Sequence, residues 1–363
     1  MSTINGQVTD LSANFIPEIW LDYLYELTTE TNAFLNSGII KNDATMGPML
    51  LQRGYYATRP HVQHIDTNLN SQKWDNKHDI TVNALDSFTD NQVKIYEAQA
   101  FGNSDFDDLI TGAKTIDQIT SQFATYWASI DEKRLMQVLK IAFMNETIKA
   151  AKSFHVGAEA EFKAEDFVKA MARMGDVSAG KPNAMAVNSA TYNFMLSQNL
   201  IDFTQPSVGA LPIGSYNGLA IVQDDQVPLT VDGKTIAYIF APGSVDYSIA
   251  TPANGVTVDR DNLKQGGIQA IAQKRVATIQ VAGTSADLSV HSQPDTWKEA
   301  IDDGTEALFK PTNDVRNISV IEYGFTIDKD FVVPGVNTTG GSKTSTPKSA
   351  NSVDSSTDGT KAK

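Results

Sequence analysis

The sequence predicts an α+β protein, and three observations lead to this class. From Thr115 to about residue 154, apolar residues recur at three- and four-residue intervals without any Gly or Pro, a pattern that predicts one long helix. From 208 to 333, short apolar runs are separated by Gly, Pro, Asn and Asp, which is typical of β-strands. Between 47 and 98 lies a polar, extended stretch that is longer than ordinary loops. The chain therefore combines one long helix with many strands.

The composition narrows the class of protein further. At 363 residues the chain is long enough for two compact units. A formal net charge of -14 opposes tight binding to DNA phosphates, and the absence of cysteine excludes disulfides, thiolate nucleophiles and cysteine-ligated metals. No apolar run approaches the roughly 20 residues that a membrane helix needs, so we expect no membrane partner. The start, MSTINGQVTDLSANF, has neither a basic leader nor an apolar segment, so we expect synthesis in the cytoplasm.

An N-terminal arm and a long excursion are expected before the long helix. Within the arm, 1–46, apolar residues at helical spacing behind a proline predict a short helix over 16–35. These residues are Ile16, Trp20, Leu24 and Leu27, behind Pro17. The stretch 47–98 has a turn-rich centre and strand-like alternation at Val93 and Ile95, so we expect a hairpin-like excursion.

A single helix over 115–154 would be about 60 Å long, which exceeds the width of a small domain. Such a helix must lie across a surface or between neighbouring chains, and we interpret it as a spine. Tyr126 and Trp127 lie in its helical register without interleaved Arg or Lys, so a base-stacking role is disfavoured. We expect these two side chains in the core or at a subunit contact.

Two further helices and a set of strands are expected after the spine. AEDFVKAMARMGD predicts a helix that ends near Gly175, and AMAVNSATYNFMLSQNLIDF predicts a strand, an N-cap at Asn188 or Ser189, and a helix. The later strands are expected at LAIVQDD, TIAYIFA, QAIAQKRVATIQVA and NISVIEYGFTI. From 335 to 363 the sequence has almost no large apolar residue and cannot offset the entropy of ordering, so we expect a flexible tail.

Motifs for metal binding are weak. In HVQHID, His61 and His64 with Asp66, or with His78 further on, are the best candidate ligands. Positions three apart on an extended segment point to opposite faces, so two solvated histidines are the favoured interpretation.

Motifs for catalysis fail on spacing or context. GVNTTGGSKT lacks the glycine that precedes lysine in a phosphate loop, and GSYNG lacks the spacing of a nucleophile elbow. The carboxylates of DFDDL and DEKR are explained more simply as favourable charges at helix starts than as acid–base pairs. We therefore expect no enzyme activity, no cofactor and no metal site.

The order of the expected elements resembles that of tailed-bacteriophage major capsid proteins of the Hong Kong 97 type. The stretches that carry the likeness are FIPEIW, YWASIDEKRLMQVLKIAF, VNSATYNFMLSQNLIDF, SYNGLAIVQDDQVP and AYIFAPGSVDYSIA. FKPTNDVRNISVIEYGF is similar to the return of the chain into the peripheral domain of that family. The likeness extends from about residue 14 to 333, and the order of the stretches makes it specific.

The resemblance implies a Hong Kong 97-type capsid fold and a protein that self-assembles, through hexamers and pentamers, into the icosahedral shell enclosing phage DNA. The long helix would run along a flat subunit, and the extended loop would reach across a neighbouring subunit. The implied divisions are the N-terminal arm with its short helix (1–46), the extended loop (47–98), the peripheral domain (99–182) with the spine helix (115–154), the axial domain (183–300), the return to the peripheral domain (301–334) and the flexible tail (335–363).

The resemblance also implies partners and a location. Because no long charged helix precedes residue 14, a separate scaffolding protein is expected in place of a fused scaffold, together with a portal. A decoration protein is a further candidate partner. The protein is expected in the virion, assembled in the host cytoplasm, and without tight DNA binding.

Subunit contacts are expected at a small set of side chains. Trp74, at the centre of the loop, is expected to pack on an adjacent subunit; the alternative is a singly exposed aromatic. Lys73 and Lys77 lie close to it, but solvated lysines are common in loops, so a covalent cross-link stays unassigned. The interface candidates are Lys73, Trp74, Lys77, Tyr126, Trp127 and Arg316.

Two alternatives from other classes stay open. The first is a β-rich surface or adhesive binding protein with a flexible C-terminal tail, and the second is a metal hydrolase built on the histidines. Electron microscopy separates the capsid from both, because only a shell former gives closed particles or rings of fivefold and sixfold symmetry. Metal analysis of the purified chain tests the hydrolase.

Overall fold

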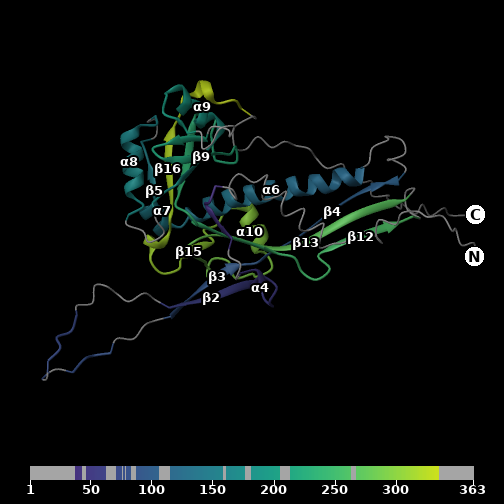
Figure 1. Ribbon diagram of the computed structural model, residues 1–363, viewed down its shortest axis with the longest axis horizontal. Helices are drawn as coiled ribbons and strands as arrows, with labels where there is room; N and C mark the ends of the chain where they lie inside the picture. The colour runs from purple at the N-terminus through teal and green to yellow at the C-terminus, as the bar shows by residue number, and fades with distance from the viewer. Residues whose placement is uncertain are drawn as a thin grey trace, which may run out of the picture.

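The computed structural model describes residues 37–42, 46–62, 71–75, 77, 79–82, 87–105, 115–157, 161–175, 181–204, 213–262 and 267–334. The helix expected over 16–35 and the tail expected from 335 on lie outside these residues. In the described part, helices and strands mix as the α+β prediction requires. Two larger sheets and one long helix organise the fold (Figure 1).

The first sheet is built around β13 (Ile268–Val281), a strand of 14 residues. It pairs antiparallel with β4 along one edge and with β12 and β11 along the other, and β1 adds to β11 in parallel. These strands are β1 (Ile40–Asn42), β4 (Ile95–Ser104), β11 (Val245–Ala250) and β12 (Val256–Asp261). Alternate residues of β13 are buried between Gln269 and Arg275, as expected for a strand with one covered face.

The long helix α6 (Thr115–Ala142) runs along this sheet (Figure 1). Its Phe123 and Trp127 pack against Ile271 of β13, so the helix covers the face to which the buried residues of β13 point. At 28 residues the helix is about 42 Å long.

The expected single helix over 115–154 is wrong in one respect, because the chain turns at 143–145 and a second helix, α7 (Glu146–Lys152), begins. The side chain of Asn145 accepts hydrogen bonds from the backbone N–H groups of Thr147 and Ile148, at 3.0 and 3.4 Å, and so caps the new helix. Apolar periodicity did not reveal the break, because Ile148 is buried in the same core as the end of α6.

The second sheet has seven strands in the order β5-β16-β10-β6-β9-β8-β7. Helices α8 (Ala164–Ala172) and α9 (Ser189–Ser197) contribute to the apolar cluster on one face. The strands are β5 (Ser153–His155), β6 (Ala184–Val187), β7 (Asp202–Thr204), β8 (Ile213–Tyr216), β9 (Leu219–Gln223), β10 (Lys234–Phe240) and β16 (Val320–Thr326). As predicted, Asn188 caps α9, and its side chain accepts from the N–H of Ala190 at 3.0 Å.

One apolar core joins the two sheets through α6. On β10, Ala237 and Ile239 belong to the cluster that contains α8 and α9, whereas Tyr238 and Phe240 belong to the cluster that contains the second half of α6. That second cluster also includes Ile279 of β13, on the first sheet. Because both sheets bury residues against the same helix, α6 acts as the spine that the sequence predicted.

The strands of the two sheets come from several of the ranges expected as domains, and the domain boundaries themselves stay a prediction. Residues 245–281, expected in the axial domain over 183–300, form β11, β12 and β13 of the first sheet beside α6. Strand β16, expected in the return over 301–334, lies in the second sheet. Strand periodicity identifies a strand but not its partner, and partners here are separated by long stretches of sequence.

A two-stranded ribbon leaves the body below the first sheet (Figure 1). Strands β2 (Tyr56–Val62) and β3 (Ser87–Val93) pair antiparallel, which fits the hairpin-like excursion expected over 47–98. The remaining elements are α4 (Met46–Leu50), β14 (Thr284–Ala286), α10 (Trp297–Asp303), β15 (Phe309–Pro311) and two short 3-10 helices, Val315–Asn317 and Lys329–Phe331. Among the described helices, none is both long enough and apolar enough to cross a membrane.

Candidate functional site

The base of the β2–β3 ribbon is fixed to the first sheet by polar contacts. Arg59 on β2 pairs with Asp246 on β11 at 3.0 Å, and Asp246 also accepts a hydrogen bond from the side chain of Gln92 on β3 at 3.2 Å. The backbone N–H of Asn91 donates to the hydroxyl of Ser285 at 3.1 Å. The direction in which the ribbon leaves the body is therefore set by both of its strands.

Helix α10 connects this base to the spine helix. The indole N–H of Trp297 donates to the hydroxyl of Tyr56 at 2.8 Å, and the two rings meet edge to face. At the other end of α10, the carboxylate of Asp302 pairs with Arg134 of α6 at 3.1 Å and with Lys298 at 2.8 Å. Burial alone would raise the pKa of Asp302, but the hydrogen bond from Lys298 and the charge of Arg134 hold that pKa below its usual value.

The far end of the ribbon exposes apolar side chains. Trp74 and Val82 are each 91% exposed, and Ile80 is 64% exposed. The tip is ordered by polar contacts: the side chain of Gln72 bonds both the N–H and the carbonyl of Thr81, at 2.6 and 2.7 Å. Exposed apolar groups of this size, held on a projecting element, are typical of an interaction site.

The lysines beside Trp74 make local contacts in the described part of the chain. Lys73 pairs with the carboxylate of Asp75 at 3.0 Å, and the backbone N–H of Lys77 donates to that carboxylate at 2.9 Å. The contacts shape the turn and leave the indole of Trp74 pointing into open space.

A cluster of buried charges lies between α6 and the first sheet. Glu97 of β4 accepts hydrogen bonds from Arg134 of α6 and, at 2.7 Å, from Arg275 of β13. The guanidinium of Arg275 also binds both carboxylate oxygens of Asp131, at 2.5 and 3.0 Å, and Asp131 accepts from the hydroxyl of Tyr247 at 2.6 Å. Burial opposes the charge on Arg275, but the carboxylates of Asp131 and Glu97 outweigh it and raise the pKa of the guanidinium above its ordinary value. The cluster fixes the helix on the sheet.

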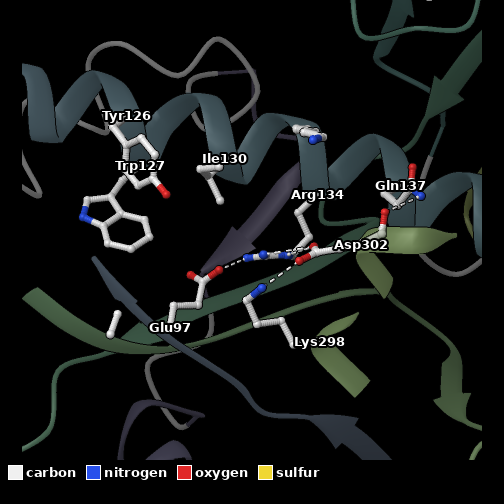
Figure 2. A pocket seen from close by; sticks show the side chains of 10 residues that line it. Glu97, Tyr126, Trp127, Ile130, Arg134, Gln137, Lys298 and Asp302 are labelled. Carbon is white, nitrogen blue, oxygen red and sulfur yellow. Dashed lines mark hydrogen bonds and ion pairs between the residues drawn. The ribbon is translucent and has the colours of Figure 1, made fainter. Parts of the chain in front are cut away.

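A groove of about 230 Å³ opens beside this cluster, between α6, α10 and β4 (Figure 2). Figure 2 shows Glu97, Arg134, Lys298 and Asp302 joined by ion pairs along one side of it. The remaining lining is contributed mostly by α6: Tyr126, Trp127, Ile130, Lys133 and Gln137, with Ala98 from β4.

The two aromatic candidates on α6 have different environments. Trp127 is 3% exposed, its N–H donates to Gln273 at 2.7 Å, and the guanidinium of Arg275 lies over its ring at 3.8 Å. Of the two placements expected for Trp127, the core or a subunit contact, its contacts within its own chain are those of a core residue. Tyr126 is partly buried, stacks edge to face on Phe101, and stays an interface candidate.

Arg316 lies on the surface near the start of β16. Its side chain is 85% exposed and pairs with Asp314. Because this side chain is exposed, it is available for a contact between copies, and its interface role stays a prediction.

Comparison with known proteins adds to this geometry. No family model matches the chain. The chain is 26% identical over 249 residues to the major capsid protein of Bacillus phage SPP1. The aligned part is 67% of this chain and 76% of the relative. Among solved structures, the capsid of Ralstonia phage GP4 matches with a TM-score of 0.50 and 10% identity, over 80% of this chain and 88% of that chain. The capsid of cyanophage Pam1 matches with a TM-score of 0.50 and 8% identity, over 82% and 92%. The chain has the Hong Kong 97 capsid fold.

The relative that matches in sequence is a major capsid protein, and the two matched structures are phage capsids. The expectation that the chain is not an enzyme stays a prediction. Of the candidate metal ligands, only His61 lies among the described residues; His64, Asp66 and His78 lie outside them. Within the described ranges, no group of three or more His, Asp or Glu side chains is arranged to hold a metal ion.

The buried charges between α6 and the first sheet were not expected from the sequence. The carboxylate of Asp131, in DEKR, was assigned to a helix start, but it lies in the interior of α6 and pairs with Arg275. A usable signal was present: Trp127, Asp131 and Leu135 follow at four-residue intervals on the buried face of the helix. A charged residue on an apolar helix face predicts a buried partner of opposite charge.

Proposed function

We propose that this chain is the major capsid protein of a tailed phage and that its copies assemble, as hexamers and pentamers, into the closed icosahedral shell around the phage DNA. The likeness to a major capsid protein in sequence and to two phage capsids in fold supports this function. The observation in the structure that carries it is the projecting ribbon. It exposes Trp74, Ile80 and Val82 at a tip that the body of the same chain does not cover.

Within the shell, the first sheet with α6 is the peripheral domain, and the second sheet with α8 and α9 is the axial domain near the fivefold and sixfold axes. The support is the division of the strands between the two sheets, which separates a long, narrow unit from a second unit covered by helices (Figure 1). The ribbon is the extended loop that reaches a neighbouring copy, and Lys73, Trp74 and Lys77 lie at that contact.

Further partners follow from the same resemblance. A separate scaffolding protein guides assembly in the host cytoplasm, and a portal occupies one vertex. A decoration protein is a third candidate. The support for these partners is the family resemblance of the sequence.

Negative-stain electron microscopy of the expressed chain tests the function. We expect closed particles, or rings with fivefold and sixfold symmetry. The proposal would be contradicted by a purified chain that stays monomeric as its concentration is raised and that also forms no particles in infected cells.

A further inference from the structure

One face of the first sheet is polar although it is buried. In the pairing of β11 with β13, Asp246 lies opposite Gln280. The next pair on the same face is Ser248 with Thr278, and all four side chains are buried. Between the two β11 residues, Tyr247 points the other way, and its hydroxyl binds a carboxylate of α6. The polar face is therefore turned away from α6.

The base of the ribbon covers this face with polar side chains of its own. Asp90 and Gln92 are two residues apart on β3, so both point to the same side, and both are buried. The side-chain amide of Gln92 donates to Asp246 at 3.2 Å. The guanidinium of Arg59 on β2 lies 3.0 Å from Asp246 and 3.6 Å from Asp90. Ribbon and sheet thus meet in one buried polar layer, which comprises Asp90, Gln92, Asp246, Thr278 and Gln280.

The polar layer holds buried oxygens whose hydrogen-bonding capacity is not used. The amide nitrogen of Gln92 is used on Asp246, and the amide nitrogen of Gln280 donates to a backbone carbonyl of β14. The amide oxygens of both glutamines and the hydroxyl of Thr278 have no hydrogen-bond partner among the described residues. Turning either amide round would set its oxygen against another oxygen, so the arrangement is fixed. Buried oxygens of this kind indicate a bound water or ion.

The charges of the polar layer favour a cation over water. Arg59 is shared by Asp90 and Asp246, so one guanidinium charge faces two carboxylate charges. Lys41 lies beside Asp246 in the pairing of β1 with β11, but its side chain is exposed and makes no ion pair with Asp246 within the described chain. A water molecule donates to unused oxygens but leaves the net negative charge in place. A cation satisfies the oxygens and reduces that charge, and a buried charge needs such compensation.

We propose that the polar layer is a binding site for one hard divalent cation, Ca²⁺ or Mg²⁺. Carboxylate, amide and hydroxyl oxygens are the ligands that these ions take in proteins. The ligands are the carboxylates of Asp90 and Asp246 and the side-chain oxygens of Gln92, Thr278 and Gln280. Only two of these groups are carboxylates, so neutral oxygens complete the set. Because the ligands come from β3, β11 and β13, the ion joins the ribbon to the first sheet within each copy and does not depend on assembly.

Metal binding to the full chain, kept as subunits below its assembly concentration, tests this site. The chain is freed of metal with a chelator and then melted in CaCl₂, in MgCl₂, or in NaCl of equal ionic strength. We expect at least one divalent ion to raise the melting temperature by several degrees and the rise to saturate, because a ligand that binds only the folded chain stabilises it by mass action. Equilibrium dialysis should find one tightly bound ion per chain. Absence of a tightly bound ion overturns the site.

Two conservative variants connect the ion to the polar layer. Gln280→Met removes an amide oxygen and Asp90→Asn removes a carboxylate charge, and both keep the length of the side chain. Each should lower the affinity for the ion by about tenfold or more in dialysis, whatever its effect on melting without metal. Gln273→Met is the matched control, because this buried glutamine of β13 lies on the face toward α6 and accepts from Trp127. Unchanged affinity in both layer variants, or an equal loss in Gln273→Met, overturns the site.

Hydrogen exchange of the unmodified chain locates the ion without any substitution, so the site is testable even where a variant does not fold. Adding the ion should slow amide exchange in β3 and β11, because ligands from both strands are then tied together. The second sheet should exchange at the same rate with and without the ion. Protection confined to other parts of the chain overturns the site and leaves the proposed function intact.

Discussion

At the residue scale, the two tryptophans singled out from the sequence have opposite roles. Trp127 is enclosed by α6 and β13, and its ring is covered by the guanidinium of Arg275. Trp74 is almost fully exposed on a polar tip. The first stabilises the subunit, and the second is available to a neighbour. Their sequence surroundings differ accordingly, since Trp127 lies in an apolar helical repeat and Trp74 among polar residues.

Replacing Trp74 by alanine should weaken assembly and leave the isolated subunit folded. Burial of a large apolar side chain contributes about 1.5 to 3 kcal/mol, and the contact repeats at every interface of the shell. Particle yield and the melting temperature of the monomer are measured side by side. Val231→Ala, at an exposed position in the turn before β10, is the control. Unchanged yield at unchanged stability would remove Trp74 from the interface, and a lower melting temperature of the monomer would place it in the core.

Replacing Arg275 by methionine should destabilise the subunit itself. The change leaves Asp131 without its guanidinium partner and Glu97 with only Arg134, and breaking a buried ion pair on one side costs about 3 to 5 kcal/mol. Denaturant unfolding of the monomer measures this. The exposed Arg316→Met is a matched control and should change the free energy of unfolding by less than about 0.5 kcal/mol. Equal effects of the two substitutions would show that the buried cluster contributes little.

The buried Lys94 should make the stability of the subunit vary with pH in the alkaline range. The side chain is buried at the base of the ribbon, its ammonium group donates to the carbonyl of Gln52 at 2.8 Å, and burial lowers its pKa. The unfolded chain then holds this proton more tightly, so this group makes stability rise with pH between its folded pKa and the ordinary value of 10.5. Lys94→Met should remove that part of the pH dependence. We compare unfolding curves of the two proteins between neutral pH and pH 10.5; parallel curves would contradict the prediction.

At the element scale, the region after α6 shows that regular apolar spacing can continue across a turn. Apolar spacing runs from 115 to 154 without a break, yet α6 ends at Ala142 and Asn145 starts the next helix by accepting from the first N–H groups of α7. The turn lets the chain pass into β5, which pairs in parallel with β16. Helix α6 thus packs against both sheets, and α7 leads into the second sheet.

The tail from Gly335 on should be dispensable for assembly, because its composition cannot bury a core of its own. A chain that ends at Pro334 should still form shells of normal appearance in electron micrographs. Loss of particles from a truncated chain whose monomer is still folded would show instead that the tail ties subunits together.

At the scale of the whole molecule, the acidic balance should keep DNA from binding tightly to the shell. A net charge of -14 leaves few clustered cations for the phosphate backbone, and this charge is independent of how the strands pair. Titration of assembled shells with random duplex DNA at physiological salt should show weak binding. Submicromolar affinity would contradict the prediction.

Contacts between residues that are far apart in the sequence also organise the molecule. Arg59 and Asp246 tie the ribbon to the first sheet, Tyr56 and Trp297 tie it to α10, and Asp302 ties α10 to the spine. The direction of the ribbon and the position of α10 therefore depend on contacts between separate elements of the chain. The sequence indicates the exposed tip through Trp74 and the helical position of Tyr126, but it does not indicate the groove that Tyr126 lines.

The sequence by itself determined what depends on neighbouring residues. The strand, cap and helix from Ala184 to Ser197 follow from a short continuous apolar run and one asparagine side chain, and both signals are local. The order of such elements was enough for the family resemblance and the α+β class.

Only the tertiary structure decided which distant elements pair. In the first sheet β13 lies between β4 and the strands β11 and β12, and β16 joins the second sheet. The sequence did not predict these pairings. Arg275 likewise meets Asp131 and Glu97 across 144 and 178 residues of sequence. The physical reason is that a strand's period and a side chain's charge specify the kind of partner needed, whereas the partner itself is fixed by burial and packing of the whole chain.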